Sequence, residues 1–121
     1  MEEKILKKFT PNGHCPVRDV LARLGDKWSI LILVTLKVNG RLRFSEIQRS
    51  IGDISQRMQT ITLRSLEADG LIKREIFAEI PPRVEYELTE RGLSLFPHIK
   101  ALVNWAYDNI DEIIADRESN L

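Results

Sequence analysis

The sequence predicts a mainly α-helical domain with a small β-hairpin, an α+β fold in which four helices precede the hairpin and one follows it. Apolar residues recur at helical spacing through most of the chain, whereas between Ile72 and Leu88 they alternate with polar residues. Gly, Pro, Asn and Asp residues separate these segments where helices and strands ordinarily end. A length of 121 residues suits one domain with a modest core, and we expect residues 1–121 to form it.

The composition excludes several classes of protein. An apolar fraction of 43% beside a charged fraction of 30% argues against a disordered chain, and a single cysteine cannot form an internal disulfide. The first ten residues, MEEKILKKFT, lack the apolar core of a secretory signal. The longest apolar run, Ile30 to Val34 and on to Leu36, falls far short of the ~20 residues that cross a bilayer. We therefore expect a cytoplasmic protein without a membrane span.

Helix-start and helix-end residues delimit the first two helices. Pro16 suits the first turn of a helix that ends before Gly25. Asp26 is predicted to cap the next helix, which is apolar nearly all round and ends at Asn39-Gly40. Such a helix belongs at the centre of a core, where we also expect the side chains of Trp28 and Phe44.

Two further helices follow a short extended link at Arg41 to Arg43. Ser45 and Gln48 have the spacing of a capping box and predict the start of a short helix. Gly52-Asp53 is the next turn. Ser55 is then expected to cap a longer helix that runs to about Asp69.

The next segment changes to a period of two residues. From Ile72 to Ile80, residues 72, 76, 78 and 80 place apolar groups on one face, and Val84, Tyr86 and Leu88 alternate with glutamates. Pro81-Pro82-Arg83 lies between the two predicted strands as a stiff link. The sequence therefore predicts a hairpin whose tip presents Arg83.

The last helix starts at Thr89 with Glu90 and carries a long apolar stripe from Ile99 to Ile114. That stripe is wide for so small a monomer, and an exposed patch of this size usually marks an interface, which predicts a homodimer. Trp105 and Tyr107 are expected to pack there. Acidic residues expected to lie away from any nucleic acid are Asp108, Asp111, Glu112, Asp116 and Glu118.

The order of elements is typical of a winged helix-turn-helix: a short helix, a glycine turn, a second helix and a hairpin. The charge distribution agrees with nucleic-acid binding. Residues 37–66 carry six basic and two acidic groups, whereas residues 85–121 carry three basic and eight acidic groups. A basic region of this kind is expected where a surface meets phosphate, although chance clustering of solvated side chains gives the same sum.

The predicted helix Ser55–Asp69 has two chemically different sides. Leu63 and Leu66 lie on one side, and three polar side chains gather within about 60° on the other. A helix in the major groove needs cationic groups, amides and small apolar groups at base edges. The candidate DNA-binding residues are Ser45, Ser55, Gln56, Arg57, Thr60, Ile61, Arg64 and Arg83. The alternative is the ordinary solvated side of an amphipathic helix.

Short motifs in a fixed order carry a family resemblance. They are Cys15-Pro16-Val17, Asp26-Lys27-Trp28, Arg43-Phe44-Ser45-Glu46, Ile54-Ser55-Gln56-Arg57-Met58, Leu66-Glu67-Ala68-Asp69-Gly70-Leu71-Ile72 and Pro82-Arg83-Val84-Glu85-Tyr86-Glu87-Leu88-Thr89. Together they resemble the HxlR-type, MarR-like bacterial transcriptional regulators over about residues 14 to 110. Gln59 departs from the family pattern, in which this position is usually apolar.

The resemblance implies a homodimer with a recognition helix at Ser55–Asp69 and a wing from Ile72 to Leu88. It places the DNA-binding core at about residues 26–89. Dimerisation elements are implied at about residues 14–25 and 93–116. The partners expected are double-stranded DNA, with an inverted-repeat operator, and a second copy of the chain. A winged-helix module that binds a protein partner instead of DNA is the alternative.

Cys15 directly precedes the first predicted helix, where the backbone dipole favours a thiolate and His14 and Arg18 could add to that effect. The resemblance implies that some members sense oxidants or electrophiles through the equivalent cysteine. The alternative is a small, partly buried residue without chemistry. Because the chain has no second cysteine, oxidation could only join two chains or add a small thiol.

No cofactor, metal site or enzymatic activity is expected. His14 and His98 are too scattered for a metal site, and no nucleophile and base stand at a characteristic spacing. A phosphate-binding glycine loop is also missing from the sequence. Lys4, Lys7 and Lys8 are interpreted as a solvated terminus rather than a DNA-binding arm.

Overall fold

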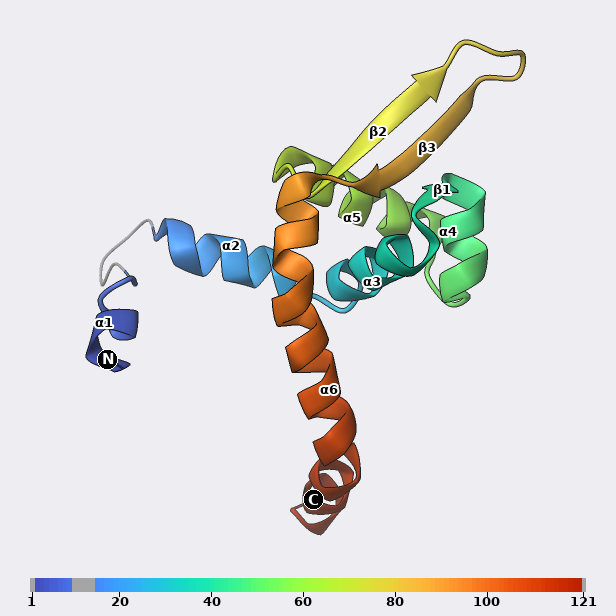
Figure 1. Cartoon of the computed structure of the whole chain (residues 1–121). Helices are drawn as coiled ribbons and strands as arrows, with labels where there is room; N and C mark the ends of the chain where they lie inside the picture. Colours follow the sequence, from blue (N-terminus) through green and yellow to red (C-terminus); the bar gives the residue numbers. More distant parts are fainter. Residues whose placement is uncertain (1, 10–14, 121) are drawn as a thin grey trace.

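The computed structural model describes residues 2–9 and 15–120. Within these residues the helices are α1 (Glu2–Leu6), α2 (Pro16–Leu24), α3 (Ser29–Asn39), α4 (Phe44–Ile51), α5 (Gln56–Ala68) and α6 (Glu90–Ser119). The strands are β1 (Arg41–Arg43), β2 (Ile72–Phe77) and β3 (Arg83–Leu88). The hairpin of β2 and β3 projects from one end of the helical body, and α6 runs along one side of that body (Figure 1). The predicted mainly helical winged helix-turn-helix fold is confirmed.

Helix α3 lies at the centre of the core. Ile32, Leu33 and Leu36 are at most 1% exposed, and they pack in one cluster with buried residues of α4, α5, β2 and α6. The Asp26 carboxylate accepts hydrogen bonds from the backbone N–H groups of Trp28 and Ser29, at 2.9 and 2.6 Å. Asp26 therefore caps this helix as predicted, although the helix itself begins at Ser29. Trp28 and Phe44 are half-buried against the same core.

The sheet contains a third strand, β1, at residues that were predicted only as an extended link. The order is β1-β3-β2, antiparallel throughout, with Leu42 opposite Tyr86. Arg41 lies opposite Glu87 and Arg43 opposite Glu85. Arg41 forms an ion pair with Glu87 at its facing strand position, and this pair helps to hold so short a strand in the sheet.

The hairpin differs from the prediction at its outer end. β2 ends at Phe77, so the expected apolar face does not continue through residues 78–80. Ile76 is 61% exposed and Ile80 is fully exposed, because the hairpin extends beyond the helices that could cover it (Figure 1). Arg83 is the first residue of β3 and lies opposite Phe77, so the prediction that it occupies the tip is wrong.

The start of α4 also corrects a prediction. The helix begins at Phe44, and the Arg43 backbone N–H donates to Oε1 of Glu46 at 2.8 Å. Glu46 therefore makes the return bond of the cap, and Ser45 lies inside the helix with an exposed side chain. The Gln48 side chain turns the other way and donates to the Ile54 carbonyl at 3.3 Å.

Helix α6 begins where expected, with the Thr89 hydroxyl accepting from the Gly92 N–H at 3.1 Å. Its 30 residues correspond to ~45 Å, and it continues through Pro97 as one helix. The C-terminal half extends beyond the rest of the molecule (Figure 1). In the described part of the chain, no helix combines the length and apolarity needed to cross a bilayer.

Candidate nucleic-acid interface

Helix α5 turns its basic side away from the core. Leu63 and Leu66 are at most 2% exposed, whereas Arg57 and Arg64 are exposed. Neither arginine forms an ion pair with any residue that the structure describes. Five predicted site residues line one surface groove: Gln56, Arg57, Thr60, Ile61 and Arg64. This surface of α5 offers two unneutralised guanidinium groups, an amide and an exposed apolar side chain.

The N-terminus of α5 is held by its predicted cap. The Ser55 hydroxyl accepts a hydrogen bond from the Met58 N–H at 3.1 Å. The first N–H groups of a helix have no intrahelical acceptor, and they form a site that favours anions. The Thr60 hydroxyl donates to the Gln56 carbonyl at 2.9 Å, so its proton is already engaged within the helix.

Gln59 holds α5 against the start of α4. Its side chain is completely buried, and Nε2 donates to the Phe44 carbonyl at 2.7 Å. Oε1 is buried as well and accepts no hydrogen bond from the residues described. The amide therefore fits at a position where the family pattern has an apolar residue, and α5 keeps the rotation that the leucines predict.

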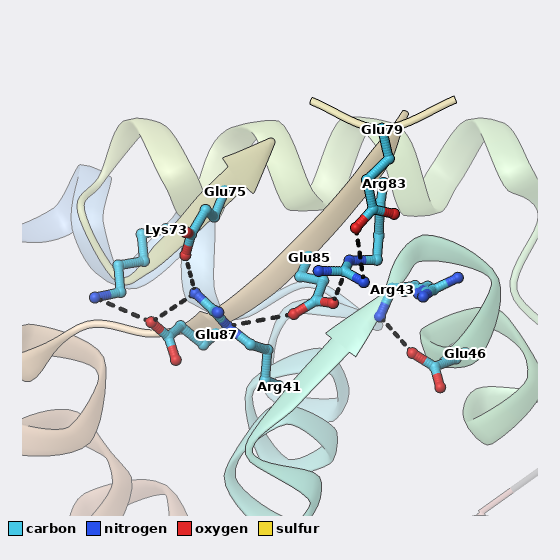
Figure 2. Close-up of polar contacts among 9 residues, drawn as sticks. All are labelled: Arg41, Arg43, Glu46, Lys73, Glu75, Glu79, Arg83, Glu85 and Glu87. Carbon is cyan, nitrogen blue, oxygen red and sulfur yellow. Dashed lines mark hydrogen bonds and ion pairs between the residues drawn. The ribbon is translucent and has the colours of Figure 1, made fainter. Parts of the chain in front are cut away.

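A second groove lies beside α4. Its lining includes Ser45, predicted as a site residue, and Arg49. Arg43 is exposed at the junction of β1 and α4, and its side chain extends away from the carboxylates of β3 (Figure 2). Within the described chain, neither Arg43 nor Arg49 forms an ion pair. Neither arginine is among the predicted site residues, although both belong to the basic region 37–66.

Arg83 lies among carboxylates rather than at an exposed tip. Nη1 is 3.2 Å from Oε1 of Glu79, and Nε is 2.9 Å from Oε2 of Glu85. The guanidinium also lies 4.1 Å from the centre of the Phe77 ring. Any DNA contact of Arg83 would have to compete with these partners, because its charge is already compensated.

The same face of the sheet holds a larger set of ion pairs, which we call the wing charge network (Figure 2). Its members are Arg41, Lys73, Glu75, Glu79, Arg83, Glu85 and Glu87. Arg41 contacts Glu75 and lies 3.6 Å from Glu85 and 3.3 Å from Glu87. With three cations and four carboxylates, this set carries no excess of positive charge.

The network shifts the pKa of two of its members. The hydrogen bond from Lys73, at 3.0 Å, lowers the pKa of the Glu87 carboxyl, and Arg41 adds to that effect. The hydrogen bond to Glu75 raises the pKa of Arg41. Both shifts favour the charged forms of Glu87 and Arg41.

Cys15 is the N-cap residue of α2 and is 6% exposed. His14, which was expected to favour its thiolate, lies outside the described residues. Arg18 is exposed in the first turn of α2. Among the residues described, no three His, Cys, Asp or Glu side chains are grouped so that they could hold a metal ion.

Helices α2 and α6 expose a large amount of apolar surface. Val20, Leu21, Leu102 and Trp105 are each more than half exposed, and Tyr107 is 81% exposed. A cavity of 230 Å³ between α2, α3 and α6 is lined mainly by leucines and isoleucines. Trp105 and Tyr107 therefore find no packing partner within the described monomer that would bury them.

Comparisons with known proteins agree with this geometry. The family model described as HxlR-like helix-turn-helix matches residues 23–114. The chain is 55% identical over 91 residues to a protein of Methanothermobacter thermautotrophicus described as an uncharacterized HTH-type transcriptional regulator, covering 75% of this chain and 69% of the relative. It is 39% identical over 122 residues to the similarly described YybR of Bacillus subtilis, covering 100% of this chain and 95% of the relative.

Solved structures with the same fold include two regulators. The structure described as the transcriptional regulator YtfH from Salmonella typhimurium has a TM-score of 0.78 and 38% identity, covering 87% of this chain and 93% of that one. The reduced form of the redox regulator HypR has a TM-score of 0.75 and 39% identity, covering 83% of this chain and 98% of that one. The family match, at residues 23–114, spans the helix-turn-helix, the wing and most of α6.

Proposed function

Because the chain belongs to the HxlR-like helix-turn-helix family of transcriptional regulators and not to an enzyme family, we propose that it is a homodimeric, sequence-specific binder of double-stranded DNA. The observation that carries this proposal is the outward side of α5. Arg57 and Arg64 lie there without carboxylate partners in the described chain, and the buried leucines fix the rotation of the helix.

In this proposal α5 is the recognition helix and enters the major groove. Arg57 and Arg64 are suited to guanine O6 and N7 or to phosphates, and Gln56 is suited to adenine. Thr60 and Ile61 supply methyl groups that can pack against thymine methyls. These residues differ in chemistry, which is what sequence discrimination requires.

Phosphate contacts come from around the recognition helix. The exposed Ser55 lies at the N-terminus of α5 and the exposed Ser45 in the first turn of α4, where helix N–H groups favour anions. Arg43 and Arg49 add exposed cations beside them. Arg83 has a smaller part than the sequence suggested, because Glu79 and Glu85 already compensate its charge.

Dimerisation uses the terminal helices. The exposed apolar residues of α2 and α6 exceed what a small monomer ordinarily leaves in water, and covering them favours association. Dimerisation elements at about residues 14–25 and 93–116 leave residues 26–89 as the DNA-binding core. A twofold dimer would present two α5 helices about 34 Å apart, to successive major grooves of an inverted repeat.

Cys15 is proposed as a site at which oxidants or electrophiles act on the regulator. The support is its place at the start of a proposed dimerisation helix and the likeness of the chain to HypR, a redox regulator. An oxidant such as diamide would accept two electrons and two protons as two chains form a Cys15–Cys15 disulfide. Diamide should change the DNA affinity of the native protein and leave the Cys15→Ser variant unaffected.

Selection from a pool of random duplexes tests the proposed function as a whole. We expect enrichment of an inverted repeat whose half-sites are about one helical turn apart. Failure of the native protein to enrich any sequence or to bind heparin would contradict the proposal. It would favour a winged-helix module that binds a protein partner.

A further inference from the structure

Two arginines from different helices meet at the C-terminal end of α5. From α2, Arg23 Nε lies 2.8 Å from Asp69 Oδ2, and its Nη2 donates to the Ser65 carbonyl at 3.3 Å. From α6, Arg91 Nη1 donates to the Asp69 carbonyl at 2.9 Å. The last carbonyls of a helix lack intrahelical donors and carry partial negative charge, so cations stabilise this end.

The attachment to α6 is extensive and rigid. Thr89 donates from its hydroxyl to the Gly70 carbonyl at 2.5 Å and from its backbone to the Leu71 carbonyl at 3.1 Å. Gly92 lies so close that a Cβ there would overlap the Leu71 carbonyl oxygen. The first turn of α6 and the turn between α5 and β2 therefore behave as one body.

The attachment to α2 has a different character. Helix α2 has no buried residue within its bounds, so little of its own surface is packed into the core. Arg23 bridges 46 positions of sequence to Asp69, and the two side chains are 38% and 29% exposed. The Arg23 carbonyl also accepts a hydrogen bond from the Ser29 hydroxyl at 3.2 Å, which fixes its backbone to the start of α3.

We propose that Arg23 and Asp69 are positioning residues that set the angle between the recognition helix α5 and helix α2. This inference rests on the proposed function. The 13 residues of α5 span ~20 Å, so a small rotation at its C-terminal end moves its N-terminal end by a larger distance. Both α2 and α6 belong to the proposed dimer interface, so the separation of the two recognition helices depends on this angle together with the attachment of α5 to α6. The pair thus determines which half-site spacing the dimer accepts.

Half-site spacing can be measured directly. The probes are the duplex selected by the native protein and two versions with the spacer lengthened or shortened by one base pair. The variants are Arg23→Met, which keeps most of the side-chain length without the charge, and Asp69→Asn. Arg117→Met removes an exposed cation from the last turn of α6, outside the proposed dimerisation elements, and is the matched control. Thermal unfolding and affinity for a non-specific duplex at low salt are measured in parallel.

The native protein and Arg117→Met should bind the selected spacing at least tenfold more tightly than the altered spacings. In Arg23→Met and Asp69→Asn this ratio should fall at least threefold, while affinity for the non-specific duplex stays unchanged. The charge swap Arg23→Asp with Asp69→Arg should restore the ratio. Asp69→Asn carries the test if Arg23→Met does not fold.

A ratio that stays at the native value in Arg23→Met and Asp69→Asn would overturn the inference and leave DNA binding intact. Equal losses for all duplexes, specific and non-specific, would overturn it as well, because they indicate a general loss of structure. If the native protein selects no sequence, the proposed function fails instead.

Discussion

Arg57 and Arg64 are available to a ligand because leucines on the opposite side of α5 hold the helix in place. Side chains three or four residues apart share a helix face, so Leu63 and Leu66 determine where the arginines point. Two arginines of the sheet, Arg41 and Arg83, form ion pairs with glutamates instead. At the residue scale, the neighbouring side chains determine whether a cation is available to a ligand.

The first prediction concerns the two arginines of α5. Arg57→Ala and Arg64→Ala should each weaken operator binding by about 1–3 kcal/mol where the side chain contacts a base edge. Arg117→Ala removes an equal charge from the C-terminal end of α6, away from α5 (Figure 1), and should have little effect. Gel-shift titration at fixed salt checks this, and native affinity in both α5 variants would contradict the assignment of the docking face.

The second prediction concerns Gln59. Gln59→Leu loses the hydrogen bond to the Phe44 carbonyl but also removes a buried oxygen that lacks a partner, so the free energy of unfolding should change by less than about 1 kcal/mol. Gln59→Ala leaves a cavity as well and should cost about 2 kcal/mol or more. Urea unfolding measures both, and equal losses would mean that the hydrogen bond dominates.

At the scale of elements, the hairpin shows how a segment can carry many charges without being a cationic surface. β3 places Glu87 between Arg41 of β1 and Lys73 of β2, and Arg41 also lies 3.6 Å from Glu85. These ion pairs stabilise the pairing of three strands. Because these ion pairs compensate the cations of the hairpin, we assign the phosphate contacts mainly to α4 and to the N-terminus of α5.

A third prediction follows from the lowered pKa of Glu87. A group whose pKa is lower in the folded state stabilises that state above its unfolded pKa, and this contribution disappears as pH falls through the folded value. Water screens the exposed pair, so the effect on stability is small. NMR titration should give Glu87 a pKa below the ordinary glutamate value of about 4.3. Lys73→Gln should raise it, and an unchanged value would contradict the assigned cause.

At the scale of the whole molecule, α2 and α6 leave apolar surface that the monomer does not cover. The C-terminal half of α6 extends past the helical body (Figure 1). A helix that projects into water with leucines and isoleucines exposed is stabilised by a partner. This arrangement separates the proposed dimer contacts from the outward side of α5.

The fourth prediction tests the dimer. Sedimentation should show a dimer at micromolar concentration, and Leu102→Glu should dissociate it because a charge would be buried in an apolar interface. Asn104→Glu, on the other side of α6, is the control and should remain dimeric. Loss of the dimer should also lower operator affinity, because one recognition helix then binds one half-site. A stable native monomer would refute the proposed assembly.

Much of the architecture could be predicted from the sequence because it depends on local rules. Pro16, Asp26, Ser55 and Thr89 start helices or cap them as their chemistry predicts. Ser45 failed as a cap because Glu46, one residue later, bonds the Arg43 N–H instead. Two overlapping cap patterns cannot be distinguished without the backbone conformation.

The amino-acid order by itself predicted the existence and order of helices α2 to α6, the hairpin and the side of α5 that faces the core, since these depend on spacing along the chain. Only the tertiary structure decided which cations lack a carboxylate partner and are therefore available to a ligand. It brought β1 beside β3, placed Arg41 against Glu87, and placed Arg23 against Asp69. The physical reason is that an ion pair depends on distance in space, and partners more than 40 residues apart leave no local pattern.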